Sequence, residues 1–163
     1  MKVGIIMGSD SDLPKMRKAA DILTVFGIDY EMVIASAHRT PAVVHDFVER
    51  IEREDGVAFV AGAGAAAHLP GVVASFTTLP VIGVPLDATA LQGMDALLAI
   101  VQMPSGMPVA TMAIDGATNA ALFAVQICGT RDANIREQYK QYRVDMAAQV
   151  ISKNEKLQAE LNG

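Results

Sequence analysis

Short apolar runs alternate along this chain with segments whose apolar residues recur every three or four positions. The runs lie at 2–7, 29–35, 57–61, 80–84 and 109–114, and the helical patterns at 13–26, 41–54, 69–76, 94–101 and 119–128. Short apolar runs bounded by glycine and proline are typical of buried strands, and the longer spacing is typical of helices. The alternation predicts an α/β fold with a parallel sheet covered on both faces.

The last segment of the chain differs in composition from the rest. From Arg131 onward, charged helix-forming residues dominate, and the apolar residues among them keep a near-helical spacing: Ile135, Tyr139, Tyr142, Met146, Val150, Leu157 and Leu161. This pattern predicts a long amphipathic helix, which either packs on its own domain or lies as an arm across neighbouring subunits. We favour the arm, and expect a single domain over 1–163 with an α/β core in 1–130 and a helical arm in 131–163.

The middle of the chain carries very little charge. Between Ala58 and Thr130 the only Asp, Glu, Lys or Arg residues are Asp87, Asp95 and Asp115. Glycine and proline interrupt the apolar runs, so none reaches the roughly 18 residues of a membrane span. A lone domain would show more charge over this length, so we expect other subunits to cover part of its helix surface. The pattern predicts a large homo-oligomer.

Net charge and cysteine content narrow the partners and the compartment. A net charge of -5 and a pI near 5.1 argue against a nucleic-acid surface, which needs clustered Lys and Arg. The single cysteine, Cys128, cannot form an internal disulfide and fits a reducing compartment. Met1-Lys2 leads directly into a short apolar run without a signal-peptide pattern. We therefore expect a cytoplasmic protein that binds neither nucleic acid nor membrane.

The segment Gly8-Ser9-Asp10-Ser11-Asp12 follows the first predicted strand and opens the first helix. Its backbone N–H groups and serine hydroxyls can form an anion site at the helix N-terminus. Two aspartates facing a phosphate would repel it, so we assign Asp12 to hydrogen bonds from ribose hydroxyls. The alternative is that these residues only cap the helix.

The segment Ser36-Ala37-His38-Arg39-Thr40-Pro41 lies between the second strand and the second helix, with Thr40 as expected N-cap and Pro41 as first helical residue. His38 and Arg39 therefore stand at the carboxyl end of a strand, where open parallel sheets bind ligands. Histidine is the residue type suited to gaining and losing a proton near neutral pH, so His38 is a candidate general acid and base, while Arg39 supplies positive charge for a phosphate. The alternative is an exposed or structural histidine.

The third loop, 61–71, is rich in glycine and alanine and contains His68 as a second polar candidate. Its Gly62-x-Gly64-x-x-Ala67 fits a loose dinucleotide pattern, with Asp87 near the position of a ribose-binding acid. The pattern follows the third strand rather than the first, which weakens it. A nucleotide- or flavin-binding module remains the second interpretation.

Other catalytic signatures are absent from the sequence. No Cys, His and carboxylate cluster has metal-ligand spacing, and no serine stands in a nucleophile elbow. We expect a small-molecule substrate with no metal and no cofactor. A third interpretation, a purely structural oligomer, would leave Ser9, Asp12, His38 and Arg39 without a role.

Four motifs in order carry a resemblance to a known family: Gly8-Ser9-x-Ser11-Asp12, Ser36-Ala37-His38-Arg39-Thr40-Pro41, Ala61-Gly62-Ala63-Gly64 through Ala66-Ala67-His68-Leu69-Pro70-Gly71, and Ile100-Val101-Gln102-Met103-Pro104. Over about Val3 to Cys128 the chain resembles the N5-carboxyaminoimidazole ribonucleotide mutases. The resemblance implies a three-layer αβα, flavodoxin-like fold with strand order 2-1-3-4-5. It also implies a homo-octamer with shared active sites, and conversion of N5-carboxyaminoimidazole ribonucleotide to 4-carboxy-5-aminoimidazole ribonucleotide without ATP or metal.

The resemblance also implies roles for individual residues. His38 would be the catalytic acid and base, and His68 would help position the migrating carboxylate. The substrate contacts would be Ser9, Asp12 and Arg39, with Ser11, Ser36, Ala37, Gly64 and Leu69 lining the site.

The chain departs from the family pattern at three places. Ala65 replaces a usual glycine, Asp87 puts an acid near a loop that the family uses around the substrate, and the segment 114–119 is about two residues shorter than usual. Members that carboxylate aminoimidazole ribonucleotide directly tend to carry Lys at the position of Arg39 and to lack the run 68–71. The chain therefore resembles the mutase class.

Overall fold

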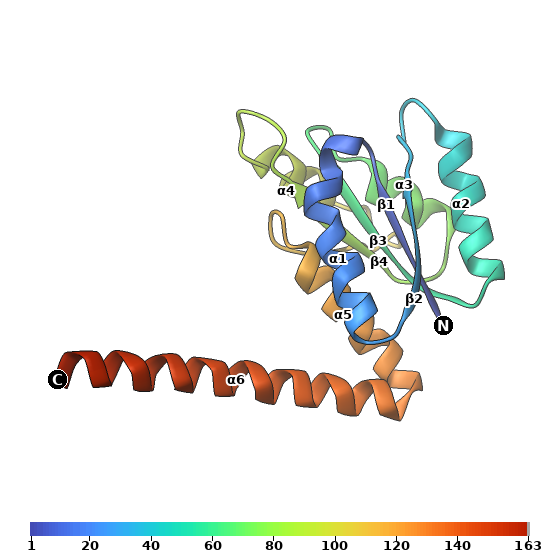
Figure 1. The fold of residues 1–163 in the computed structure, drawn as a ribbon. Helices are drawn as coiled ribbons and strands as arrows, with labels where there is room; N and C mark the ends of the chain where they lie inside the picture. Colours follow the sequence, from blue (N-terminus) through green and yellow to red (C-terminus); the bar gives the residue numbers. More distant parts are fainter. Residues whose placement is uncertain (163) are drawn as a thin grey trace.

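The computed structural model describes residues 1–162, which form a five-stranded parallel sheet in the order β2-β1-β3-β4-β5 (Figure 1). The strands are β1 (Lys2–Met7), β2 (Asp29–Ile34), β3 (Gly56–Gly64), β4 (Val81–Leu86) and β5 (Ala110–Thr111). The helices are α1 (Leu13–Val25), α2 (Pro41–Arg53), α3 (Leu69–Phe76), α4 (Met94–Val101), α5 (Ala117–Arg131) and α6 (Ala133–Asn162), with a 3-10 turn η1 at Asp10–Asp12. The predicted strand order and the long C-terminal helix are confirmed.

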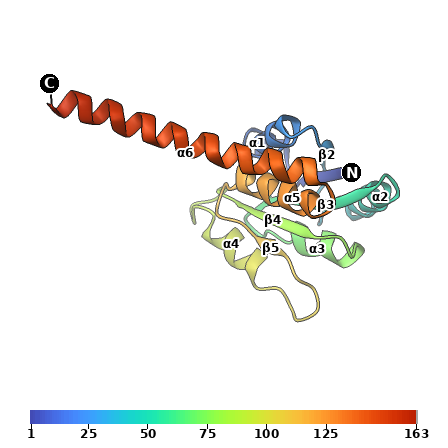
Figure 2. The same ribbon diagram turned by 90° about the horizontal axis from the view of Figure 1, so that it is seen from below.

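Helices cover both faces of the sheet and give the fold its three layers (Figure 2). On one face α1 and α5 pack in a core with Met16, Leu23 and Val125. On the other, α2, α3 and α4 pack in a second core that contains Phe47 and Ile100. The expected flavodoxin-like αβα fold is confirmed, and it brings the carboxyl ends of β2, β1 and β3 side by side.

The edges of two strands differ from the predicted bounds. β5 was expected over 109–114 but contains only Ala110 and Thr111, which pair with Ile82 and Gly83 of β4. Beyond Thr111 the ladder gives way to single hydrogen bonds, from the N–H of Met112 to Gly83 and from the N–H of Asp115 to Pro85. β3 continues through the glycine-rich segment to Gly64, since β4 pairs with it as far as Leu86. The loop that follows β3 is therefore shorter than the sequence suggests.

The helix α6 leaves the domain and extends into solvent (Figures 1 and 2). It begins after Asp132, whose extended backbone ends α5 and whose carboxylate accepts hydrogen bonds from the backbone N–H of Asn134 and Ile135. Of its described residues only Ile135 is buried. The expectation that this arm crosses neighbouring subunits stays a prediction. No helix within residues 1–162 combines the length and the apolar character needed to cross a membrane.

Candidate functional site

The loops that follow β1, β2 and β3 meet around a cavity of about 210 Å³ at the carboxyl edge of the sheet. Its lining includes nine of the ten residues predicted from the sequence: Ser9, Ser11, Asp12, Ser36, Ala37, His38, Arg39, Gly64 and Leu69. His68 does not line the cavity but contacts His38. The three loops come together because β1 lies between β2 and β3.

The first loop is a compact turn closed by its own side chains. The Oγ of Ser9 accepts a hydrogen bond from the backbone N–H of Ser11 at 3.3 Å, and the backbone N–H of Ser9 donates to Oδ2 of Asp12 at 3.1 Å. Asp12 is only 7% exposed. Burial raises the pKa of its carboxyl, and the N–H groups of the turn and the charge of Lys15 act in the opposite direction. Capping and cavity lining thus coexist in this loop.

The second loop turns tightly and carries Arg39 back toward the first. Thr40 is the N-cap residue of α2 and Pro41 opens the helix, as predicted, but the hydroxyl of Thr40 makes no capping bond. It accepts from the backbone N–H of Ser36 at 2.9 Å instead and so closes the turn. Arg39 donates from Nη2 to the carbonyl of Gly8 at 3.3 Å and from Nε to Oγ of Ser36 at 3.4 Å. These bonds use part of the five N–H donors of a guanidinium, so Arg39 can also bind an anion.

The two candidate histidines form a direct pair. Nε2 of His38 lies 2.8 Å from Nδ1 of His68, with the rings nearly perpendicular at 78°. One of these nitrogens must carry the hydrogen that the other accepts. This contact links the second loop to the start of α3.

The third loop brings backbone strain and close packing to the cavity. Ala65 has a φ of 52°, in the left-handed region that costs about 1–2 kcal/mol for a residue with a Cβ. A Cβ on Gly64 would lie 2.5 Å from the Cβ of Ala88, and one on Gly62 would lie 2.4 Å from the sulfur of Met16. Gly62 is thus a packing residue inside β3, so the dinucleotide pattern does not form a turn at a helix N-terminus.

Sequence reasoning missed two contributors at this edge. Ala88, from the loop after β4, lines the cavity. Lys15, on α1, donates to the carbonyl of Asp87 at 2.6 Å and pairs with Asp115 at 2.9 Å. Asp87 marked the loop after β4 as a departure from the family pattern. Nothing in the sequence indicated that Lys15 would bind its carbonyl.

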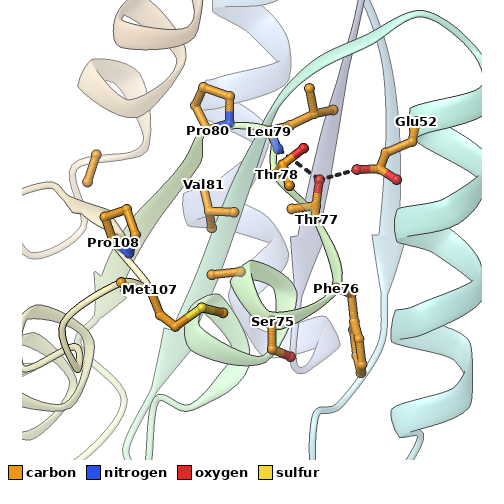
Figure 3. A pocket seen from close by; sticks show the side chains of 13 residues that line it. Glu52, Ser75, Phe76, Thr77, Thr78, Leu79, Pro80, Val81, Met107 and Pro108 are labelled. Carbon is orange, nitrogen blue, oxygen red and sulfur yellow. Dashed lines mark hydrogen bonds between the residues drawn. The ribbon is translucent and has the colours of Figure 1, made fainter.

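A second, larger hollow of about 880 Å³ lies at the amino edge of the sheet. Figure 3 shows Phe76, Met107 and Pro108 around it, with the hydroxyl of Thr77 between the carboxylate of Glu52 and the backbone of Leu79. Glu52 is the one ionisable side chain among its described lining residues. The rest of its described lining is apolar side chains and the hydroxyls of Ser75, Thr77 and Thr78, with no cation to bind a phosphate.

Metal and thiol chemistry find little support in the described part of the chain. Within residues 1–162 no group of three His, Cys, Asp or Glu side chains is placed to hold a metal ion. The thiol of Cys128 is buried in the core between α5 and the sheet, and burial raises its pKa. A buried protonated thiol is a poor nucleophile.

Known proteins resemble this chain in sequence and in fold. A model of the AIR carboxylase family matches residues 2–149. The chain is 54% identical over 156 residues to the N5-carboxyaminoimidazole ribonucleotide mutase of Pyrococcus horikoshii, covering 96% of this chain and 88% of that protein. It is 48% identical over 156 residues to the chloroplastic phosphoribosylaminoimidazole carboxylase of Vigna aconitifolia, covering 96% of this chain and 28% of that protein. The crystal structure of Treponema denticola PurE has 32% sequence identity and a TM-score of 0.87, covering 96% of this chain and 98% of that one. This chain belongs to the AIR carboxylase family.

Proposed function

We propose that this protein is a purine-biosynthetic isomerase that converts N5-carboxyaminoimidazole ribonucleotide to 4-carboxy-5-aminoimidazole ribonucleotide. The observation that carries the proposal is the meeting of His38, Arg39, Ser9 and Asp12 at one small cavity. Relatives that bear the mutase name are about as long as this chain and about half identical to it. The reaction moves a carboxylate within one molecule and needs no ATP.

The first two loops fit the phosphate and ribose of the substrate. Ser9 and the N-terminal turn before α1 offer donors to the phosphate, and Arg39 adds charge from the neighbouring loop. One carboxylate oxygen of Asp12 already accepts from the backbone N–H of Ser9. The other oxygen would accept hydrogen bonds from the ribose hydroxyls. Ser11, Ser36, Ala37, Gly64 and Leu69 complete the lining.

His38 would move the proton that the reaction requires. Protonated His38 donates to the carbamate nitrogen, the C–N bond breaks, and carbon dioxide is released inside the cavity. The ring carbon then attacks the carbon dioxide to form the C–C bond, and neutral His38 removes the ring proton. The imidazole returns to its starting state, so the proton balance closes over one turnover.

His68 would support both stages of this cycle. Its Nδ1 contacts Nε2 of His38, so it fixes the orientation of that ring and shares its proton. From the start of α3 it would also help position the migrating carboxylate. A residue acting in this way should affect both the rate and its dependence on pH.

An isomerisation assay with and without ATP tests the proposed reaction. We expect the purified protein to convert the carbamate substrate at the same rate in both conditions. The second candidate is direct carboxylation of aminoimidazole ribonucleotide, suggested by the carboxylase name of the Vigna aconitifolia relative. Turnover of aminoimidazole ribonucleotide with carbon dioxide, and none with the carbamate, would replace the mutase proposal.

We also propose that the chain acts as a single cytoplasmic domain with a helical arm and assembles into a homo-octamer with shared sites. Large apolar side chains stand exposed on α4 and on the arm: Met94, Leu98, Val101, Val144, Val150, Ile151, Leu157 and Leu161. Burying them between subunits would remove this surface from water. Light scattering should give the mass of eight chains, and a monomer would contradict the assembly.

A further inference from the structure

The loop between β4 and α4, residues 87–93, forms one wall of the candidate cavity. Ala88 lines the cavity, and a Cβ on Gly64 would lie 2.5 Å from the Cβ of Ala88. The 87–93 loop therefore lies directly against the third loop. A shift of the loop by an ångström would change the shape of the space that the substrate must occupy.

Side chains from two other elements hold the first residue of this loop. Lys15 of α1 donates from Nζ to the carbonyl of Asp87 at 2.6 Å and pairs with Oδ2 of Asp115 at 2.9 Å. Oδ1 of Asp115 accepts from the backbone N–H of Asp87 at 3.1 Å. Both backbone groups of Asp87 are thus bound by one ion pair, whose side chains are 29% and 35% exposed. Partial burial strengthens such a pair relative to a fully exposed one.

The far half of the 87–93 loop is held differently. Thr89 donates to Oδ2 of Asp95 at 2.9 Å and accepts from the backbone N–H of Leu91 at 3.1 Å. Gln92 and Gly93 then take left-handed φ values of 53° and 81° before α4 begins. These contacts build the loop onto its own helix. The bonds from Lys15 and Asp115 instead join it to α1 and to the turn before α5.

Lys15 also stands about one helical turn after Asp12, the residue that precedes α1. Burial raises the pKa of Asp12, and the charge of Lys15 opposes part of that rise. The same ammonium group therefore faces the first loop and the 87–93 loop. Lys15 is not among the cavity-lining residues, so it does not act on the substrate directly.

We propose that Lys15 and Asp115 are positioning residues that hold the 87–93 loop, and with it Ala88, against Gly64, and that they thereby set the affinity of the cavity for its substrate. This inference rests on the proposed mutase function for its kinetic consequence. The mechanical part, the fixing of the loop, does not depend on the reaction.

Lys15→Met, compared with Lys15→Arg, tests the pair in the full-length protein. Met keeps most of the aliphatic stem and loses the charge, whereas Arg keeps both charge and donors. In Lys15→Met we expect KM for the carbamate substrate to rise about tenfold, with kcat within about threefold of wild type, because ground-state binding is lost. Lys15→Arg should restore most of the affinity. Equal KM values for wild type and Lys15→Met would overturn the proposal.

Hydrogen exchange in the absence of substrate gives a readout independent of turnover. The backbone amides of residues 87–91 should exchange faster in Lys15→Met, while those of β1 and β3 stay protected. Unchanged exchange at the 87–93 loop would refute the fixing role even if KM rises. If wild-type protein shows no mutase activity, the proposed function fails while the exchange result still decides the role of Lys15.

Asp115→Asn provides a second variant that should fold. Asparagine tolerates the left-handed φ of 57° at this position and keeps an oxygen for the N–H of Asp87, but it loses the charge that pairs with Lys15. It should raise KM less than Lys15→Met does. The double variant should be no worse than Lys15→Met alone, since both changes remove one interaction. Additive losses would contradict a shared pair.

Discussion

The two hollows at opposite edges of the sheet differ in size and in chemistry, and the larger hollow is not the one with the reactive side chains. The hollow at the amino edge is about 880 Å³ and that at the carboxyl edge about 210 Å³. The larger one has a mainly apolar lining, whereas the smaller one collects serines, an aspartate, a histidine and an arginine. Volume alone would therefore have pointed away from the proposed site.

The direction of the strands explains this difference. In a parallel sheet, every helix that follows a strand begins at the carboxyl edge and returns to the amino edge. The N-termini of α1, α2 and α3 thus face the smaller cavity, where their N–H groups favour an anion. The amino edge receives helix C-termini, such as the end of α3 at Phe76, whose carbonyls disfavour a phosphate.

The largest effect is expected when one histidine beside each hollow is replaced by asparagine and the two variants are compared. His38→Asn should lower kcat by about 10²- to 10⁴-fold, the usual contribution of a general acid and base, with little loss of stability. His45→Asn is the matched control, because His45 packs against Phe76 beside the larger hollow. Steady-state assays of both variants should show loss only in the first. An active His38→Asn variant would remove the assigned role.

The close contact between Gly64 and Ala88 predicts a smaller but reversible effect. Gly64→Ala should push the 87–93 loop outward and reduce kcat/KM by about tenfold or more, because even an ångström of displacement is costly at a reacting centre. The double variant Gly64→Ala with Ala88→Gly removes the opposing methyl group. Recovery of kcat/KM in the double variant would establish the steric cause, and no recovery would contradict it.

At the amino edge, Thr77→Val should affect stability and leave catalysis unchanged. The substitution removes the hydroxyl that bonds Glu52 and accepts from the backbone N–H of Leu79. We expect about 1 kcal/mol of lost unfolding free energy, measured by urea denaturation, since one backbone donor loses its partner. A matching fall in kcat/KM at a temperature where the variant is fully folded would show that this edge takes part in the reaction.

The smallest effect concerns the strained backbone at Ala65. Ala65→Gly relieves the left-handed conformation but adds freedom to the unfolded chain, so we expect stabilisation of less than about 1 kcal/mol. Ala66→Gly, next to it but without a positive φ, should instead destabilise the protein. Thermal melts of the ligand-free proteins measure both changes in stability. If the two variants shift the melting temperature in the same direction, backbone strain at Ala65 is not the reason.

The sequence predicted those features that depend on position relative to a strand. Ser9, His38 and Gly64 each follow a predicted strand, and the strand order alone brings them to one edge. The direct contact of His38 with His68 was not foreseen, because it depends on how two loops from strands on either side of β1 lean together.

Contacts between distant segments were beyond prediction for a related reason. The pair of Lys15 with Asp115 joins α1 to a turn far along the chain. Asp115 has a left-handed backbone conformation, and periodicity does not report such conformations. The early end of β5 was missed as well, since periodicity does not show that this strand pairs with β4 at only two positions.

The projecting helix α6 has a consequence for how this protein folds. Its 30 residues extend about 45 Å, yet one described side chain in it is buried. Its first turns pack on the core through Ile135, Tyr139 and Tyr142, whereas residues 143–162 are exposed. An exposed helix is marginal in water, so in the proposed assembly this outer part would gain stability from a neighbouring subunit. If the proposed assembly forms, the α/β core can fold in a unimolecular step, whereas full helicity of the outer part of α6 would await an encounter with a second chain. Refolding followed by circular dichroism should then show a fast phase independent of protein concentration and a slower phase whose rate rises with it.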